Sequence, residues 1–152
     1  MKIVAQRVSR SSVTAFGKTI GEIGPGMCIL VGVAPDDTER EAVWTADRIT
    51  DLRVFEDEAG KMNKSLLETG GEALVISQFT LYADCRKGRR PSFSGAALPD
   101  AAKTLYEALV KRMGERGIVV RTGIFGADMR VEIINEGPVT IILDTATDMP
   151  HK

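Results

Sequence analysis

Polar side chains interrupt an apolar segment of the sequence where they could form the floor of a binding pocket. The segment is Glu72–Tyr82, EALVISQFTLY, and the interruption consists of Ser77, Gln78 and Thr80. If the strand continues through it, Ser77 and Phe79 face one way while Gln78 and Thr80 face the other. A buried polar group without a partner costs about 1–3 kcal/mol. These residues therefore indicate either a strand that emerges into solvent or a pocket floor.

A cluster of four cations follows directly, in the stretch ADCRKGRRPSFSG at residues 83–95. Gly88 and Pro91 predict a loop rather than a helix face. The cluster consists of Arg86, Lys87, Arg89 and Arg90, with Asp84 as the opposing charge. Such clusters are usually solvated surface, but Arg also binds phosphate oxygens through paired hydrogen bonds. Apart from Phe93 there are few aromatic residues nearby, so base stacking along this loop is poorly supported.

The third segment is Asn135–Thr140, NEGPVT, which lies between two apolar stretches. Pro138 has no N–H to donate to a β-ladder, so we expect a strand boundary or a bulge there. The residues alone are compatible with an ordinary turn. They favour a trans Gly137–Pro138 bond, because only about 5–6% of X-Pro bonds in folded proteins are cis.

The composition excludes several kinds of chemistry. The single histidine, His151, is the second-last residue, which argues against a Ser-His-Asp triad, a Cys-His pair, a histidine zinc site or a histidine general base. Cys28 and Cys85 fit no metal-binding spacing, and Cys28 is expected in the core. No G-x-G-x-x-G or Walker loop is present, so we expect neither a metal nor a nucleotide cofactor.

Charge and hydropathy narrow the class of protein further. The 152 residues include 20 basic and 21 acidic ones, which excludes a polybasic protein that binds nucleic acid over its whole surface. No segment approaches the roughly 18–20 apolar residues of a membrane span, and no signal-peptide apolar region is evident. Two distant cysteines favour a reducing, cytoplasmic location.

Strands are predicted in the first and last thirds of the chain, around two main helices. A capping-box pattern at Thr38 and Glu41 predicts the start of one helix, and apolar spacing predicts another over Asp100–Arg116. The predicted strands are Lys2–Val8, Ser12–Phe16, Thr19–Ile23, Met27–Ala34, Leu52–Phe55, Ile118–Arg121, Val131–Ile134 and Val139–Leu143. This order indicates one α+β domain over residues 1–152 with a mixed or antiparallel sheet.

Several of these segments resemble the D-aminoacyl-tRNA deacylase family. The similarity lies in SQFTLY at 77–82, RKGRRPSF at 86–93 and NEGPVT at 135–140. The opening MKIVAQRVSRSSV and the stretch FGADM at 125–129 are also similar to that family, so the resemblance runs essentially from end to end. The pairing of SQ-x-TL with N-x-GP-x-T is highly specific, whereas either motif alone is weak.

The resemblance implies a barrel-like sheet and a homodimeric enzyme without cofactor. Such an enzyme hydrolyses the ester that joins a D-amino acid to the 3′ end of tRNA, and also removes glycine from mischarged alanine tRNA. Gly137 and Pro138 would form a cis selector that reaches into the other subunit's pocket and rejects L-amino acids, with Arg7 holding it. The pocket would consist of Ser77, Gln78, Phe79 and Thr80. Met129 would lie near the terminal adenosine, and Arg86, Lys87, Arg89 and Arg90 would contact tRNA.

Hydrolysis without histidine requires another source of catalysis. Backbone N–H groups of Phe79 and Thr80, or the Gln78 amide, are candidates for stabilising an oxyanion. Thr80 has no evident base to activate it as a nucleophile, so we favour a water activated by the substrate's 2′-hydroxyl. Two other functions stay open: a related deacylase for L-amino acids, and a tRNA-binding module without catalysis.

Overall fold

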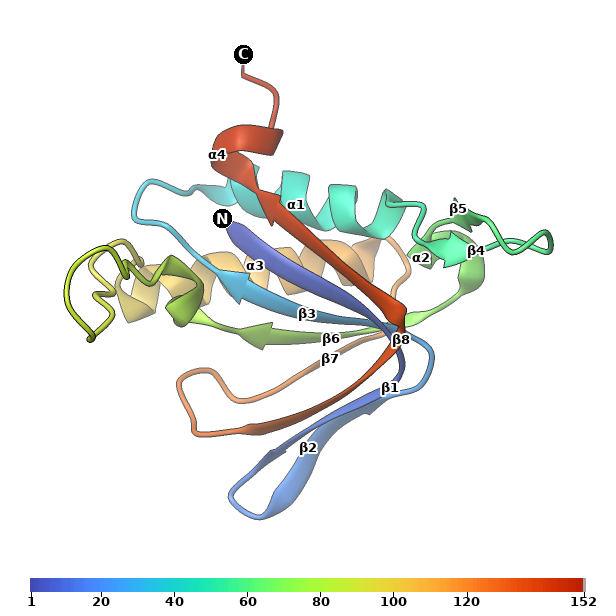
Figure 1. The fold of residues 1–152 in the computed structure, drawn as a ribbon, viewed down its shortest axis with the longest axis horizontal. Helices are drawn as coiled ribbons and strands as arrows, with labels where there is room; N and C mark the ends of the chain where they lie inside the picture. The colour runs from blue at the N-terminus through green and yellow to red at the C-terminus, as the bar shows by residue number, and fades with distance from the viewer. Residues whose placement is uncertain (152) are drawn as a thin grey trace.

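The longest-range pairing of the chain joins its first and last strands. The computed structural model describes residues 1–151, and strand β1 (Lys2–Ala15) pairs antiparallel with β8 (Arg130–Asp144) from Lys2↔Asp144 to Thr14↔Arg130. β1 also pairs antiparallel with β2 (Lys18–Ile23) and β3 (Gly26–Gly32). β3 continues the sheet in parallel to β6 (Glu72–Ser77), which pairs in parallel with β7 (Val120–Thr122). These six strands form the predicted mixed sheet, which is strongly curved (Figure 1).

The two longest strands correct the sequence prediction at their irregular centres. Lys2–Val8 and Ser12–Phe16 belong to the single strand β1, and Val131–Ile134 and Val139–Leu143 belong to β8. The predicted irregularity at Pro138 is confirmed as a register shift rather than as the end of a strand. Gln6 pairs with Thr140 and Val8 with Asn135, so Arg7 alone lies opposite Glu136–Val139. Four residues of β8 therefore bulge out beside one residue of β1.

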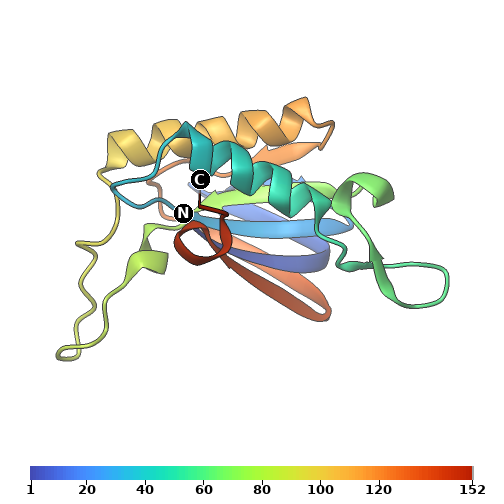
Figure 2. The same cartoon turned by 90° about the horizontal axis from the view of Figure 1, so that it is seen from above.

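The two predicted helices are present, and they cover one face of the sheet (Figures 1 and 2). α1 (Glu39–Asp51) begins with the expected capping box between Thr38 and Glu41. α3 (Pro99–Glu115) begins one residue before its predicted start. The two helices are joined by Arg112, whose Nε and Nη2 donate to the Asp47 carboxylate over 2.7 and 3.1 Å. The fold is therefore α+β, a single domain with two main helices.

Both faces of β3 are buried, which explains its continuous apolar sequence. Met27, Ile29 and Val31 pack in the cluster between the sheet and the helices. Cys28 packs with Leu74 in a second cluster on the other face, inside the curve of the sheet. Cys28 is thus a core residue, as predicted, and burial raises the pKa of its thiol. The sheet is stabilised from both sides.

Shorter elements connect this frame. β4 (Phe55–Glu56) and β5 (Met62–Lys64) form a separate hairpin, so the predicted strand Leu52–Phe55 is wrong except at its last residue. α2 (Leu66–Thr69) leads into β6, and α4 (Thr145–Asp148) follows β8. The predicted strand Ile118–Arg121 is displaced to β7. No helix in the described part of the chain is long and apolar enough to cross a membrane.

Two glycines are expected to respond in opposite directions to alanine. A Cβ at Gly26 would overlap the Glu72 carbonyl group of the neighbouring parallel strand, whereas one at Gly114 of α3 meets nothing within 4 Å. Gly26→Ala should lower the free energy of unfolding by at least about 1–3 kcal/mol. Gly114→Ala should raise it by about 0.5–1 kcal/mol, because alanine is the better helix former. Urea denaturation measures both, and a loss of stability in Gly114→Ala would contradict the prediction.

Candidate functional site

The apolar strand ends at Ser77, and the chain then turns sharply. The backbone N–H of Gln78, directly after the end of β6, donates to the Val31 carbonyl over 2.7 Å. Phe79–Tyr82 then forms the 3-10 helix η1. The predicted alternation of Ser77 and Phe79 against Gln78 and Thr80 is therefore wrong beyond Ser77. Gly32 permits this turn, because a Cβ there would lie 3.1–3.2 Å from atoms of Leu81, Gln78 and Tyr82.

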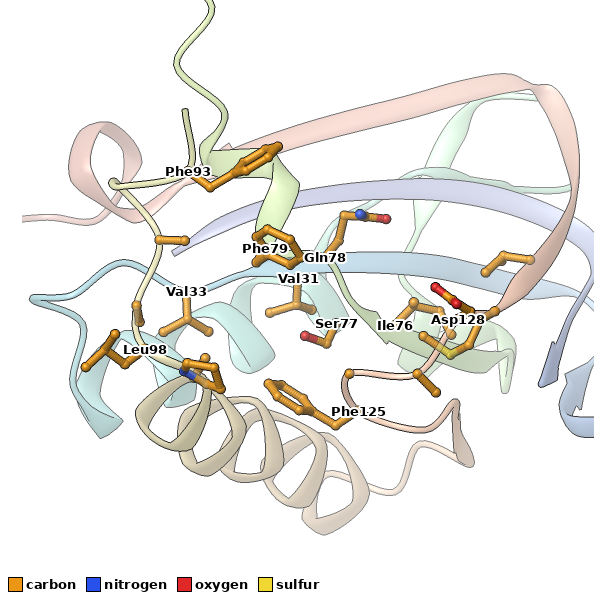
Figure 3. Close-up of a pocket in the computed structure, with 18 residues that line it drawn as sticks. Val31, Val33, Ile76, Ser77, Gln78, Phe79, Phe93, Leu98, Phe125 and Asp128 are labelled. Atoms are coloured by element: carbon orange, nitrogen blue, oxygen red, sulfur yellow. The ribbon is translucent and has the colours of Figure 1, made fainter. Parts of the chain in front are cut away.

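A cavity of about 590 Å³ opens where β6 meets η1. Ser77, Gln78 and Phe79 line it, and Figure 3 shows Ser77 and Gln78 pointing in different directions from their adjacent positions. Its other walls are mostly apolar and come from β3, the start of α3 and the segment before β8. They include Val31, Phe93, Leu98, Phe125 and Met129. An apolar cavity with a few convergent polar groups is typical of a small-ligand site.

Thr80 does not line this cavity, although the sequence placed it in the pocket. Its side chain is exposed, and its hydroxyl accepts a hydrogen bond from Gln78 Nε2 over 2.5 Å. Asp128 is the one ionisable side chain among the described residues that line the cavity. Among the described residues, no hydrogen bond joins the Thr80 hydroxyl to an ionisable side chain, so a role for Thr80 as an activated nucleophile stays without an evident base.

The backbone N–H groups at the start of η1 follow shortly after Ser77 in the chain. Those of Phe79 and Thr80 have no hydrogen-bond partner in the part of the chain that the structure describes. The first N–H groups of a helical turn are normally left without an intrahelical partner. Two main-chain donors are thus available next to Ser77.

The bulged segment Glu136–Val139 is held from both sides. Arg7 is 8% exposed, and its Nε donates to the Glu136 carbonyl over 2.8 Å while Nη1 donates to the Val54 carbonyl over 2.8 Å. On the other side, Asn135 Oδ1 accepts from the Val139 N–H over 2.8 Å. The segment's main chain is therefore fixed by two side chains from the strands that flank it.

Gly137 and Pro138 lie at the exposed tip of this segment. Their peptide bond is cis, so the trans geometry favoured by residue statistics is wrong here. Gly137 has φ +134°, and a Cβ there would lie 2.9 Å from Arg7 Nη2. Neither residue lines the cavity around Ser77 in the same chain. The structure therefore joins Arg7 with Gly137 and Pro138, but it does not bring them to the pocket of one protomer.

The basic loop, residues 83–95, projects from the body of the molecule beside η1 (Figure 2). A bridge between Asp84 and Ser92 closes it, and its four cations are exposed. Arg86 donates twice to the Asp84 carboxylate, over 2.8 and 2.7 Å, which holds the pKa of Asp84 below its ordinary value. At the base of the loop, Phe93 contacts Phe79 edge to face with ring centroids 5.1 Å apart. This aromatic contact connects the loop to the cavity wall.

Comparison with known proteins decides the family. The family model described as D-Tyr-tRNA(Tyr) deacylase matches residues 4–144, which include the cavity floor, the basic loop and the bulged segment. The chain belongs to this family. The predicted resemblance is thereby confirmed, and with it the prediction of a deacylase enzyme at the level of the family.

Curated relatives and solved structures agree with that assignment. The D-aminoacyl-tRNA deacylase of Bacillus velezensis is 54% identical over 145 residues, which cover 95% of this chain and 99% of that protein. That of Thermotoga petrophila is 53% identical over 146 residues, or 96% and 98% of the two chains. A structure described as a c-Myc DNA unwinding element binding protein has a TM-score of 0.89 and 42% identity, covering 95% and 98%. A probable eukaryotic D-amino acid tRNA deacylase shares the fold, with a TM-score of 0.82, 16% identity and coverage of 93% and 97%.

Two contributors to these sites could not be identified from the sequence. Val54 holds Arg7 through its main-chain carbonyl, so its side-chain type carried no signal. Leu98 is 79% exposed at the cavity wall, immediately before α3. The sequence shows only a leucine directly before the predicted helix, and its exposure, which indicates a role in binding, is visible only in the structure.

Arg7 and Arg10 lie on the same strand and form a matched pair for mutation. Arg7→Ala removes two charge-assisted hydrogen bonds to carbonyls and should lower the free energy of unfolding by about 2–3 kcal/mol. Arg10 is 48% exposed and pairs with Glu22 and Glu132, so Arg10→Ala should cost less than about 1 kcal/mol. Urea denaturation measures both values, and equal losses would show that Arg7 is no more important to the fold than a surface arginine.

Proposed function

We propose that this chain hydrolyses the ester between a D-amino acid and the 3′-terminal nucleotide of tRNA. The observation that carries the proposal is the cavity at the end of β6, where Ser77 and Phe79 lie among mostly apolar walls. The main-chain N–H groups of Phe79 and Thr80, shortly after Ser77, have no partner among the described residues. Such a site can hold an aminoacyl group and stabilise a developing oxyanion. The deacylases of Bacillus velezensis and Thermotoga petrophila, by their names, act on this class of substrate. Glycine mischarged on alanine tRNA is a second proposed substrate, because it presents no side chain to exclude.

The attacking water is proposed to be activated by the substrate. Asp128, the ionisable group among the described lining residues, is exposed at the cavity edge rather than at its floor. The Thr80 hydroxyl lies outside the cavity and is occupied by the Gln78 amide. The 2′-hydroxyl of the terminal nucleotide is adjacent to the ester in every substrate molecule. It is therefore the group we assign to orient the attacking water and to relay its proton. The 2′-oxygen accepts a proton from the water as that water attacks the carbonyl carbon, and the 2′-hydroxyl proton passes to the departing 3′-oxygen, while the N–H groups of Phe79 and Thr80 bind the oxyanion.

Discrimination between D and L substrates is assigned to Gly137 and Pro138 of a second copy of the chain. The exposed main chain at these residues is held firmly by Arg7 and Asn135, yet it does not line the cavity of its own protomer. A rigid wall of main chain placed beside the α-carbon would exclude an L side chain by steric clash while a D side chain points away. This arrangement requires a homodimer.

Two exposed apolar side chains of β8 support that dimer. Ile142 is 71% exposed and Ile134 is 43% exposed, and they lie in β8 on either side of the bulged segment. Exposed apolar side chains next to a functional segment are typical of subunit interfaces.

We further propose a cytoplasmic location, where aminoacyl-tRNA is used.

A paired deacylation assay tests the function. D-Tyr-tRNA and L-Tyr-tRNA are incubated separately with equal, low concentrations of enzyme, and ester loss is followed with time. Fast loss of the D ester with the L ester spared is expected. Loss of both esters would contradict the selector and favour a less discriminating deacylase. Binding of tRNA without loss of either ester would favour the non-catalytic module.

The same assay with Thr80→Val examines the catalytic step. This variant should retain turnover within about tenfold, less than the roughly 10²–10³-fold that loss of an oxyanion donor costs. Complete loss together with a trapped acyl-enzyme would instead establish Thr80 as the nucleophile.

The basic loop is proposed to bind the phosphates of tRNA, and salt dependence tests it. Lys87, Arg89 and Arg90 are exposed, whereas Arg86 is paired with Asp84. Arg89→Ala should weaken tRNA binding and reduce the log–log salt slope by about 0.7–0.9, the value for one phosphate contact. Lys111→Ala on α3, where the side chain is 79% exposed, is the control and should leave the slope unchanged. An unchanged slope in Arg89→Ala would mean that this arginine is solvated surface.

A further inference from the structure

A second cavity lies directly beside the one that contains Ser77. It measures about 570 Å³ and is lined by Thr14–Gly17 at the turn between β1 and β2 and by Asp128, Met129 and Arg130 at the start of β8. The pairing of Thr14 with Arg130 holds the two segments together. Asp128 and Met129 line both cavities, so a ligand that extends past Met129 from the first cavity enters the second.

Phe16 is the dominant side chain of this second cavity, and the fold does not account for it. It is 79% exposed, at the tip of the β1–β2 hairpin. Its backbone has φ +51°, followed by Gly17 at φ +72°. Two consecutive positive φ values are typical of a hairpin turn that favours Asn-Gly, and phenylalanine is a poor choice for the first position. Neither packing nor turn chemistry explains this aromatic ring, which leaves its surface available to a ligand.

The charge around the second cavity suits a nucleotide. Arg130 lines it and is exposed, and Lys18 follows Gly17 with an exposed side chain. Asp128 is the opposing carboxylate, and it lies on the side shared with the first cavity. The hairpin tip and the loop before β8 lie at the same end of the molecule as η1 and the basic loop (Figure 1). An extended RNA end that crosses this region meets cations on both sides of the cavities.

We infer that the second cavity binds the nucleotide that precedes the aminoacylated one, with its base stacked on Phe16 and its phosphate beside Arg130. This inference rests on the proposed function and on the family resemblance, which implies that the terminal adenosine lies near Met129, a residue that lines both cavities. Stacking on an aromatic ring tolerates any base and is a common way to bind single-stranded RNA ends. The second cavity would thus contribute to affinity for tRNA without contributing to recognition of the amino acid.

Two substrates separate this role from the chemistry. D-Tyr-tRNA carries the preceding nucleotide, whereas the D-tyrosyl ester of adenosine alone does not. Phe16→Ala should lower kcat/KM for D-Tyr-tRNA about tenfold, within the range for loss of one stacked base, and leave kcat/KM for the adenosine ester unchanged. Phe16→Trp should retain activity on both. Val119→Ala is the matched control, because Val119 is 47% exposed and its carbonyl accepts from Ala73 at the opposite end of β6.

Binding provides a readout that is independent of catalysis. The probe is a trinucleotide that ends in adenosine and carries fluorescent 2-aminopurine as the preceding base. Its fluorescence should be quenched by the unmodified protein and by Phe16→Trp, but not by Phe16→Ala. Equal quenching by Phe16→Ala, or equal losses on both substrates, would overturn the inference. If the unmodified protein hydrolyses neither substrate, the proposed function itself fails, which is a distinguishable result.

Discussion

The unequal number of residues that β1 and β8 contribute around Arg7 is the constraint on which the arrangement of this molecule depends. Arg7 lies alone opposite Glu136–Val139, while β1 and β8 stay paired on both sides of it, with a second register shift between Val8 and Arg10. The excess main chain cannot be absorbed by the ladder and must leave the sheet. Arg7 fills the resulting space and donates to the Glu136 and Val54 carbonyls. Because the same guanidinium satisfies both carbonyls, the bulged segment and the chain entering β4 are fixed relative to each other.

The cavity depends on a different kind of break in regular structure. β6 lies between β3 and β7 and then ends at Ser77, where the chain turns into η1 over Gly32. This turn leaves the N–H groups of Phe79 and Thr80 without partners among the residues that the structure describes, and it directs Phe79 toward Phe93. The apolar clusters on both faces of β3 and β6 hold the strand end in place. A rigid frame thus positions a short irregular segment, which is a common way to build a binding site.

Local sequence signals predicted the elements that local interactions determine. Three features could be predicted because their signals act within a few residues. A helix cap predicted the start of α1 at Thr38–Glu41, apolar spacing predicted the helix near Asp100–Arg116, and a continuous apolar run predicted the burial of β3. The turn after Ser77 could not be predicted from local signals, because it depends on Gly32, which is distant in the sequence. The geometry at Pro138 depends likewise on Arg7 and Val54. Family resemblance, rather than the residues themselves, indicated that Gly137 and Pro138 matter.

The pairing of β1 with β8 also has a consequence for biosynthesis. Lys2 pairs with Asp144 and Gln6 with Thr140. β1 therefore cannot be fully paired until β8 has been made. Contacts of such sequence separation form slowly, because nearly the whole chain must be ordered to close them. On the ribosome, β1 therefore emerges long before its partner, and no nascent chain that stops short of β8 contains the bulged segment. The bulged segment therefore takes its place opposite Arg7 only after β8 has been made.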